Sequence, residues 1–94
     1  MPESPPGLTD LPPPIITLTT DFGAADGFPA AMKGVILGIE RGATVVDATH
    51  DVPPGDIAHA SFTLAAFSPY FPAGTVHVAV VDPGVGTDRK PLVV

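Results

Sequence analysis

The sequence predicts an α/β fold in which three parallel strands alternate with two helices. Three runs have the β-branched, largely apolar character of strands covered on both faces: Ile15 to Thr20, Thr44 to Thr49 and Val76 to Val81. Between them lie two stretches whose apolar residues recur at helical spacing. A β-α-β-α-β order of this kind requires crossover connections, and therefore a parallel sheet between layers of helix.

Each predicted helix has its own start and stop signals. The first begins near Asp26, which we expect to be its N-cap, and ends at the pair Arg41-Gly42. The second follows a turn at Pro53-Pro54-Gly55, with Asp56 as its N-cap, and ends before Pro69. The apolar stripes consist of Phe28, Met32, Val35, Ile36 and Ile39 in the first helix, and Ile57, Ala60, Leu64 and Phe67 in the second.

The two ends of the chain differ from its body. Residues 1–14 contain six prolines and few large apolar side chains, so we predict an extended or disordered lead-in and assign the α/β domain to residues 15–94. Lys90 to Val94 begins what reads as a further strand. Three strands and an unfinished fourth leave apolar edges uncovered. We therefore expect a truncated N-terminal domain of a longer protein, or an oligomer that covers this edge.

Composition narrows the classes of partner. The chain has 94 residues, 45% of them apolar and 15% charged, and a formal net charge of -6, which is typical of one small globular domain. Four lysines and arginines are too few for a nucleic-acid surface. The chain has no cysteine and no apolar stretch near the ~20 residues of a membrane span. We expect a cytoplasmic protein with a small-molecule ligand.

Acidic residues follow all three predicted strands. Asp21, Asp51 and Asp82 each stand in the turn after a strand, so their carboxylates should gather where ligands bind in open α/β sheets. The Asp21 carboxylate has enough lone pairs to accept both hydroxyls of a ribose, although Asp before an aromatic and Gly is also ordinary turn chemistry. The three acids together could hold a divalent metal, but their spacing does not require one.

The segment from Asp82 to Arg89, Asp-Pro-Gly-Val-Gly-Thr-Asp-Arg, contains the densest group of candidate residues. A loop of this length can fold back so that Arg89 pairs with Asp82, keeps it ionised and lets it orient a water. The alternatives are an exposed ion pair on a surface turn, and a phosphate-binding loop. The latter lacks the lysine of a P-loop and the third glycine of a dinucleotide fingerprint.

The three histidines have different expected environments. His77 lies within a strand and is expected to be packed, and His59 is expected on the solvated face of the second helix. His50 shares the strand-end region with Asp21 and Asp82, where it either joins the site or caps the turn. None of the three has the spacing of a helical metal-ligand motif.

Several blocks of the sequence, in order and covering residue 15 to the end, form a recognisable set: Ile16 to Gly23, Asp26, Met32 to Ile36, Val46 to His50, and Phe71 to Thr87. Together they closely resemble the S-adenosylmethionine hydroxide adenosyltransferases, relatives of the bacterial fluorinase and chlorinase. One departure is Phe28-Pro29-Ala30, where the family usually has a Tyr-Val-Gly-like segment; proline is tolerated in the first turn of a helix.

The resemblance implies a trimeric enzyme in which water attacks the ribose C5′ of S-adenosylmethionine and releases methionine and adenosine, with no cofactor and no metal. A β-barrel domain follows the α/β domain in this family, and the substrate lies between subunits. By position, Asp21 matches the aspartate that binds the ribose diol, and Asp82 and Arg89 match two members of an Asp-Arg-His group that orients water. The histidine of that group lies beyond Val94 in the family.

The resemblance also separates hydrolases from halogenases, which have a tyrosine at the position of Asp82 and an aromatic residue near Gly55. A carboxylate at Asp82 repels a halide and holds a water, so hydrolysis is the predicted reaction. Two alternatives from other classes remain: a non-catalytic module that binds S-adenosylmethionine or adenosine, and an acid-rich, metal-dependent hydrolase.

Overall fold

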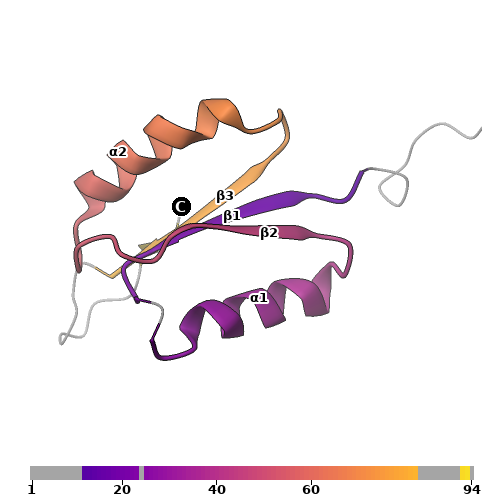
Figure 1. Ribbon diagram of the computed structural model, residues 1–94, viewed down its shortest axis with the longest axis horizontal. Helices are drawn as coiled ribbons and strands as arrows, with labels where there is room; N and C mark the ends of the chain where they lie inside the picture. The colour runs from indigo at the N-terminus through magenta and orange to yellow at the C-terminus, as the bar shows by residue number, and fades with distance from the viewer. Residues whose placement is uncertain (1–11, 24, 83–91, 94) are drawn as a thin grey trace, which may run out of the picture.

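Three parallel strands form the centre of the molecule: β1 (Ile15–Thr20), β2 (Thr44–Thr49) and β3 (Val76–Val81). The structure is a computed structural model that describes residues 12–23, 25–82 and 92–93 (Figure 1). The strand order is β2-β1-β3-β4, in which the short β4 (Leu92–Val93) pairs antiparallel with β3. The predicted parallel α/β arrangement is therefore confirmed, with an antiparallel addition at one edge.

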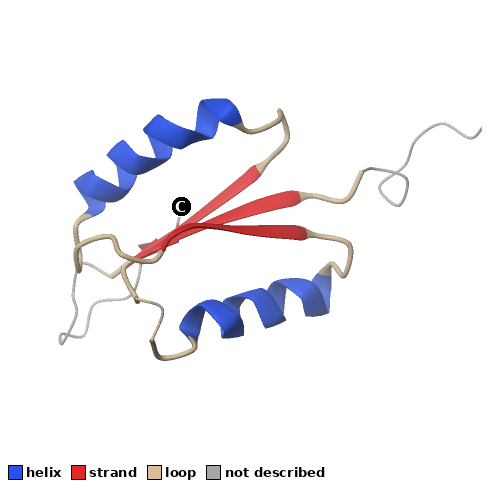
Figure 2. Cartoon of the chain, viewed as in Figure 1, coloured by secondary structure: helices blue, strands red, loops and turns tan. Residues whose placement is uncertain are grey.

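The two helices lie on opposite faces of this sheet (Figures 1 and 2). Helix α1 (Phe28–Ile39) connects β1 to β2 on one face. Helix α2 (Ile57–Phe67) continues into the 3-10 turn η2 (Ser68–Tyr70) and leads from β2 to β3 on the other. Because β2 and β3 lie on opposite sides of β1, the direction of winding reverses between β1 and β3. In doubly wound sheets, ligands bind at the carboxyl ends of the strands beside such a reversal.

The helix starts confirm one predicted cap and correct the other. Asp56 caps α2, since its Oδ1 accepts a hydrogen bond from the His59 amide at 2.8 Å. The cap of α1 is Gly27, in the left-handed region with φ of 74°, and no side chain caps this helix. The prediction for Asp26 was wrong because a left-handed glycine turns the chain into the helix there, and glycine adopts that conformation without strain. Pro29 lies in the first turn of α1, as expected.

The core lies around β1 and on the α2 side of the sheet. Leu18 of β1 and Ala79 of β3 are fully buried, and a buried cluster of Val52, Ala60 and Val81 lies between α2 and the sheet. The β1 threonines are also fully buried. Alternate side chains of a strand point to opposite faces, so the Thr17 and Thr20 side chains lie on opposite faces of the sheet.

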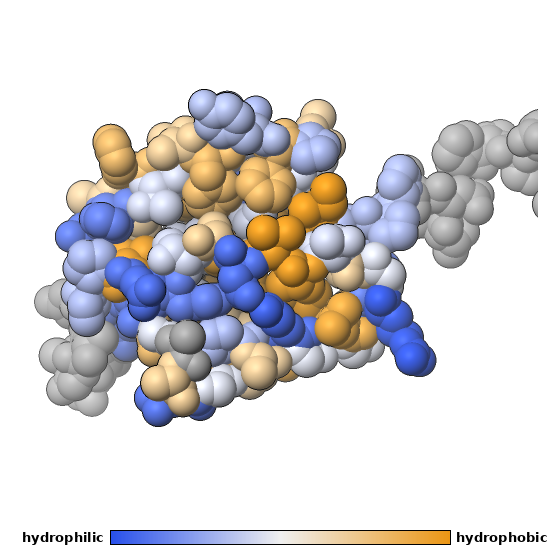
Figure 3. All heavy atoms as spheres, in the orientation of Figure 1, coloured by the Kyte–Doolittle hydropathy of each residue, from blue (hydrophilic) through white to orange (hydrophobic). Residues whose placement is uncertain are grey.

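Helix α1 is less covered than its apolar stripe predicts. None of its residues is buried, and Ile39 is 83% exposed. The described part of the chain provides no element on the outer side of α1, so the side chains that do not reach the sheet stay in contact with solvent. Apolar side chains also reach the surface over α2 and the strands in the view of Figure 3. Neither described helix has the length and hydropathy that crossing a membrane requires.

Of the proline-rich lead-in, residues 1–11 lie outside the described residues. Pro12 to Pro14 have no regular structure, although the Pro14 carbonyl accepts a hydrogen bond from the Thr44 amide at 2.9 Å. This bond belongs to the first residue pair of β1 and β2, Ile15 with Thr44.

Candidate functional site

Asp21 lies at the carboxyl end of β1, where the winding of the sheet reverses. Its Oδ2 accepts two backbone hydrogen bonds, from the Gly55 amide at 2.8 Å and from the Asp82 amide at 3.1 Å. Gly55 belongs to the turn before α2, and Asp82 follows β3 directly. One carboxylate oxygen therefore joins three segments that are far apart in sequence.

The second oxygen of Asp21 is placed differently. Among the described residues, Oδ1 accepts no hydrogen bond, and the side chain is only partly buried. A carboxylate oxygen has two acceptor sites, so two amides occupy Oδ2 while Oδ1 keeps its capacity for a ligand. The geometry suits a carboxylate that is oriented by the backbone and accepts hydroxyl donors through one oxygen.

The structure brings Asp82 to Asp21, as the sequence predicts for neighbouring parallel strands. Asp82 is half-buried, and its backbone amide donates a hydrogen bond to Asp21 Oδ2. This hydrogen bond fixes the backbone from which the Asp82 side chain projects. Arg89, the predicted partner of Asp82, lies outside the described residues, as does most of the loop that carries it.

Asp51 does not join the pair. It is exposed, and its amide donates to the Thr49 hydroxyl at 3.1 Å. Within residues 12–23, 25–82 and 92–93, no three histidine, aspartate or glutamate side chains gather in a way that could hold a metal ion. The metal arrangement of Asp21, Asp51 and Asp82 that the sequence left open is thus not formed by these three residues.

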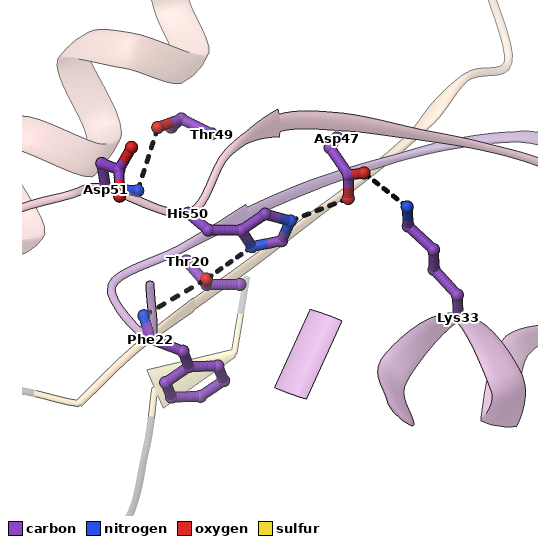
Figure 4. A network of polar contacts seen from close by, with 7 residues as sticks. All are labelled: Thr20, Phe22, Lys33, Asp47, Thr49, His50 and Asp51. Atoms are coloured by element: carbon purple, nitrogen blue, oxygen red, sulfur yellow. Dashed lines mark hydrogen bonds and ion pairs between the residues drawn. The ribbon is translucent and has the colours of Figure 1, made fainter. Parts of the chain in front are cut away.

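His50 follows β2 directly, at the same edge of the sheet, and each of its ring nitrogens has a polar partner (Figure 4). Nδ1 is 2.8 Å from the Thr20 hydroxyl, and Nε2 is 2.7 Å from Asp47 Oδ1. Asp47 Oδ2 in turn accepts from the Lys33 ammonium of α1. The contacts of both nitrogens are satisfied when Nε2–H donates to Asp47 and the Thr20 hydroxyl donates to Nδ1, and we assign the hydrogen bonds in these directions.

The charges of this network act on Asp47. The hydrogen bond from Lys33, followed by that from His50, lowers the pKa of the Asp47 carboxyl below its usual range, while desolvation opposes them. The carboxylate therefore stays ionised at neutral pH and is a strong acceptor for the His50 ring.

An irregularity in strand pairing explains why sequence reasoning missed this contact. Leu18 pairs with Asp47 and Thr19 pairs with Thr49, so Ala48 has no partner on β1. Residues three apart in a regular strand point to opposite faces, whereas an extra residue redirects the side chains beyond it. Asp47 and His50 consequently face the same side, where Lys33 also lies. The sequence therefore carries no reliable signal for the contact between His50 and Asp47.

The other two histidines confirm their predicted environments. His77 is partly buried, packs edge-on against the rings of Phe67 and Phe71, and its Nδ1 is 2.7 Å from the Thr17 hydroxyl. His59 is exposed on α2. Neither is hydrogen-bonded to Asp21, whose described partners are the Gly55 and Asp82 amides.

Comparisons with known proteins agree on one family. Residues 16–94 match the family described as SAM hydroxide adenosyltransferase N-terminal domain. The chain is 54% identical over 79 residues to an (R)-S-adenosyl-L-methionine hydrolase of Salinispora arenicola, and 48% identical over 84 residues to one of Methanocaldococcus jannaschii. It is also 35% identical over 77 residues to a fluorinase of an Actinoplanes species.

Solved structures show the same fold. A crystal structure of a conserved hypothetical protein from Thermus thermophilus superposes with a TM-score of 0.70 at 42% identity, over 83% of this chain and 32% of that one. The alignments with the Salinispora and Methanocaldococcus hydrolases include 84% and 85% of this chain. The chain spans only 30% and 32% of the length of those two relatives.

Proposed function

Because the chain belongs to the SAM hydroxide adenosyltransferase family, we propose that the full-length protein hydrolyses S-adenosylmethionine to adenosine and methionine. The observation that carries the proposal is the anchored Asp21 carboxylate beside Asp82, at the edge where the winding of the sheet reverses. The relatives named as hydrolases support the same reaction.

The reaction is a displacement at one carbon. The water oxygen forms a bond to the ribose C5′, the bond from C5′ to the sulfonium sulfur breaks, and its electron pair stays on sulfur as methionine becomes a neutral thioether. One proton of the water passes to solvent, and its remaining O–H becomes the 5′-hydroxyl of adenosine. A sulfonium is already a good leaving group, so the protein needs chiefly to hold the sugar, align the water and exclude competing solvent.

We assign the two acids to different parts of this task. Asp21 accepts hydroxyl hydrogens of the ribose through Oδ1, while Gly55 and Asp82 hold Oδ2. Asp82, with Arg89, orients the attacking water. A carboxylate at position 82 disfavours a halide as the nucleophile, which separates the proposed hydrolase from the related fluorinases. The net charge of -6 suits a cationic substrate.

Further parts of the proposal come from the family resemblance. We propose that the full-length protein is a cytoplasmic homotrimer with its substrate between subunits, and that it uses S-adenosylmethionine as substrate without a cofactor or metal. We propose neither a nucleic-acid nor a membrane partner.

The test is turnover of S-adenosylmethionine by the full-length protein in ¹⁸O-labelled water. We expect adenosine and methionine in equal amounts, with the label in the adenosine 5′-hydroxyl, as measured by chromatography and mass spectrometry. Asp82→Asn and Arg89→Ala should lower kcat at least ~100-fold with a smaller change in KM, whereas Asp21→Ala should mainly raise KM.

Asp51→Asn is the matched control, because Asp51 follows β2 at the same edge of the sheet but is exposed. It should leave both constants unchanged. Unchanged kcat in Asp82→Asn would remove the water-orienting role. Binding of S-adenosylmethionine by the wild type without any turnover would favour a non-catalytic binding module.

A further inference from the structure

His50 is almost completely buried, with 8% of its surface exposed, behind the turn that carries Asp21. Its ring is hydrogen-bonded to Thr20, at the end of β1, and to Asp47 (Figure 4). Asp47 in turn accepts a hydrogen bond from Lys33 of α1. A buried imidazole with both nitrogens partnered is fixed in orientation, because any rotation of the ring breaks a hydrogen bond in a poorly solvated place.

Backbone contacts tie the same residue to the Asp21 turn. The His50 carbonyl accepts a hydrogen bond from the Gly23 amide at 2.7 Å, and the Thr20 hydroxyl accepts from the Phe22 amide at 3.3 Å. Asp21 thus lies between two anchored segments. Before it, the Thr20 hydroxyl is hydrogen-bonded to the His50 ring; after it, the Phe22 and Gly23 amides donate to Thr20 and to the His50 carbonyl. Few movements of the turn are possible without breaking one of these bonds.

The order of groups, carboxylate, imidazole and hydroxyl, is that of a nucleophilic triad, but the arrangement cannot act as one. A nucleophile must be reachable by its substrate, whereas Thr20 is fully buried and its oxygen already accepts from Phe22. The network therefore acts on position and not by covalent chemistry.

We propose that His50 is a positioning residue for the ligand-binding carboxylate: through Thr20 and the Gly23 amide it holds the Asp21 turn so that Asp21 meets the Gly55 and Asp82 amides. Asp47 and Lys33 fix the ring from the side of α1. The inference rests on the proposed function in so far as Asp21 binds the ribose. The placement of Asp21 itself is a separate, measurable property.

A second threonine-histidine pair on β1 provides a matched control. The Thr17 hydroxyl is hydrogen-bonded to His77 Nδ1 at 2.7 Å, and the Thr20 hydroxyl to His50 Nδ1 at 2.8 Å. Both threonines are fully buried. The two pairs lie on opposite faces of β1, and the Thr17 pair packs against α2, away from Asp21. His50→Leu and His77→Leu each remove one such bond, as do the nearly isosteric Thr20→Val and Thr17→Val. Thr20→Val also removes the acceptor of the Phe22 amide.

The first measurement is amide hydrogen exchange at Gly55 and Asp82 in the full-length protein without ligand. Both amides donate to Asp21, so exchange should quicken at least ~5-fold in His50→Leu and Thr20→Val, and stay as in the wild type in His77→Leu and Thr17→Val. His50→Asn, which keeps a polar atom near the position of Nδ1, should restore part of the protection. Equal exchange in the two sets of variants would overturn the proposal.

The second measurement is the affinity for adenosine by titration calorimetry. We expect Kd to rise about tenfold in His50→Leu and Thr20→Val, and to stay unchanged in the two control variants. Wild-type protein that binds no adenosine would refute the proposed function, and the exchange contrast would still decide whether His50 positions Asp21. If His50→Leu does not fold, unchanged exchange and affinity in Thr20→Val relative to Thr17→Val would overturn the proposal.

Discussion

Asp47 connects three elements through a single carboxylate. It lies on β2, it accepts from Lys33 on α1, and it accepts from His50, which reaches β1 through Thr20. The side chain of Asp47 is 38% exposed, so its ion pair with Lys33 is partly screened by solvent and contributes little by itself. Its main effect is to fix the direction of the histidine ring.

Asp47→Asn should make the stability of the protein less sensitive to acid. Because the Lys33 and His50 hydrogen bonds lower the pKa of Asp47 in the folded state, its contribution is complete above about pH 4 and is lost as pH falls through the lowered pKa. Urea unfolding at several pH values between about 6 and 2.5 measures this: the wild type should lose more free energy of unfolding than Asp47→Asn.

Lys33→Gln removes the larger cause of the lowered pKa of Asp47. It should therefore also make the free energy of unfolding depend less on pH. Parallel curves for the wild type and both variants would show that Lys33 and His50 do not lower the pKa of Asp47 in the folded state.

At the scale of the element, the two helices begin in different ways. An aspartate side chain that accepts from the third residue along caps α2, whereas α1 begins at a left-handed glycine without a side-chain cap. The aspartates near these two starts, Asp56 and Asp26, look equivalent in the sequence. Only Asp56 is placed to satisfy an amide of the first turn.

Asp56→Ala should therefore lower the free energy of unfolding by about 1 kcal/mol, since it leaves the His59 amide without its partner. Asp26→Ala is the control and should change it by less than about 0.5 kcal/mol. Denaturant unfolding of both variants measures the difference. Equal losses would contradict the assignment of the caps.

The strands and the neighbouring acids could be predicted because they follow from local patterns. Runs of β-branched residues mark β1 to β3, and parallel strands bring the residues after them to one edge, which predicts that Asp21 and Asp82 meet. The His50-Asp47 contact could not be predicted, because it depends on the unpaired Ala48, and register irregularities have no reliable sequence signature. The pairing of Asp82 with Arg89 stays a prediction.

At the scale of the whole molecule, burial is uneven. The central strand is buried on both sides, whereas α1 contributes no buried residue and several apolar side chains of both helices are exposed. The stability of the 94-residue chain should therefore depend far more on β1 than on α1.

Two substitutions of the same kind test this unevenness. Leu18 is fully buried and Leu37 is 41% exposed, so Leu18→Ala should lower the free energy of unfolding by about 2–5 kcal/mol and Leu37→Ala by less than about 1 kcal/mol. Urea denaturation of the 94-residue chain measures both. A loss of several kcal/mol in Leu37→Ala would show that the outer side of α1 is covered in solution.

The junction at Asp21 has a thermodynamic consequence for any molecule that binds there. Its anchored oxygen is held jointly by the turn before α2 and by the residue after β3, so the carboxylate keeps its orientation only while these segments stay docked on β1. A bound nucleoside thus favours the assembled state of all three segments at once. Saturation should appear as a single cooperative rise in melting temperature, shared by the central strands, and not as the ordering of one loop.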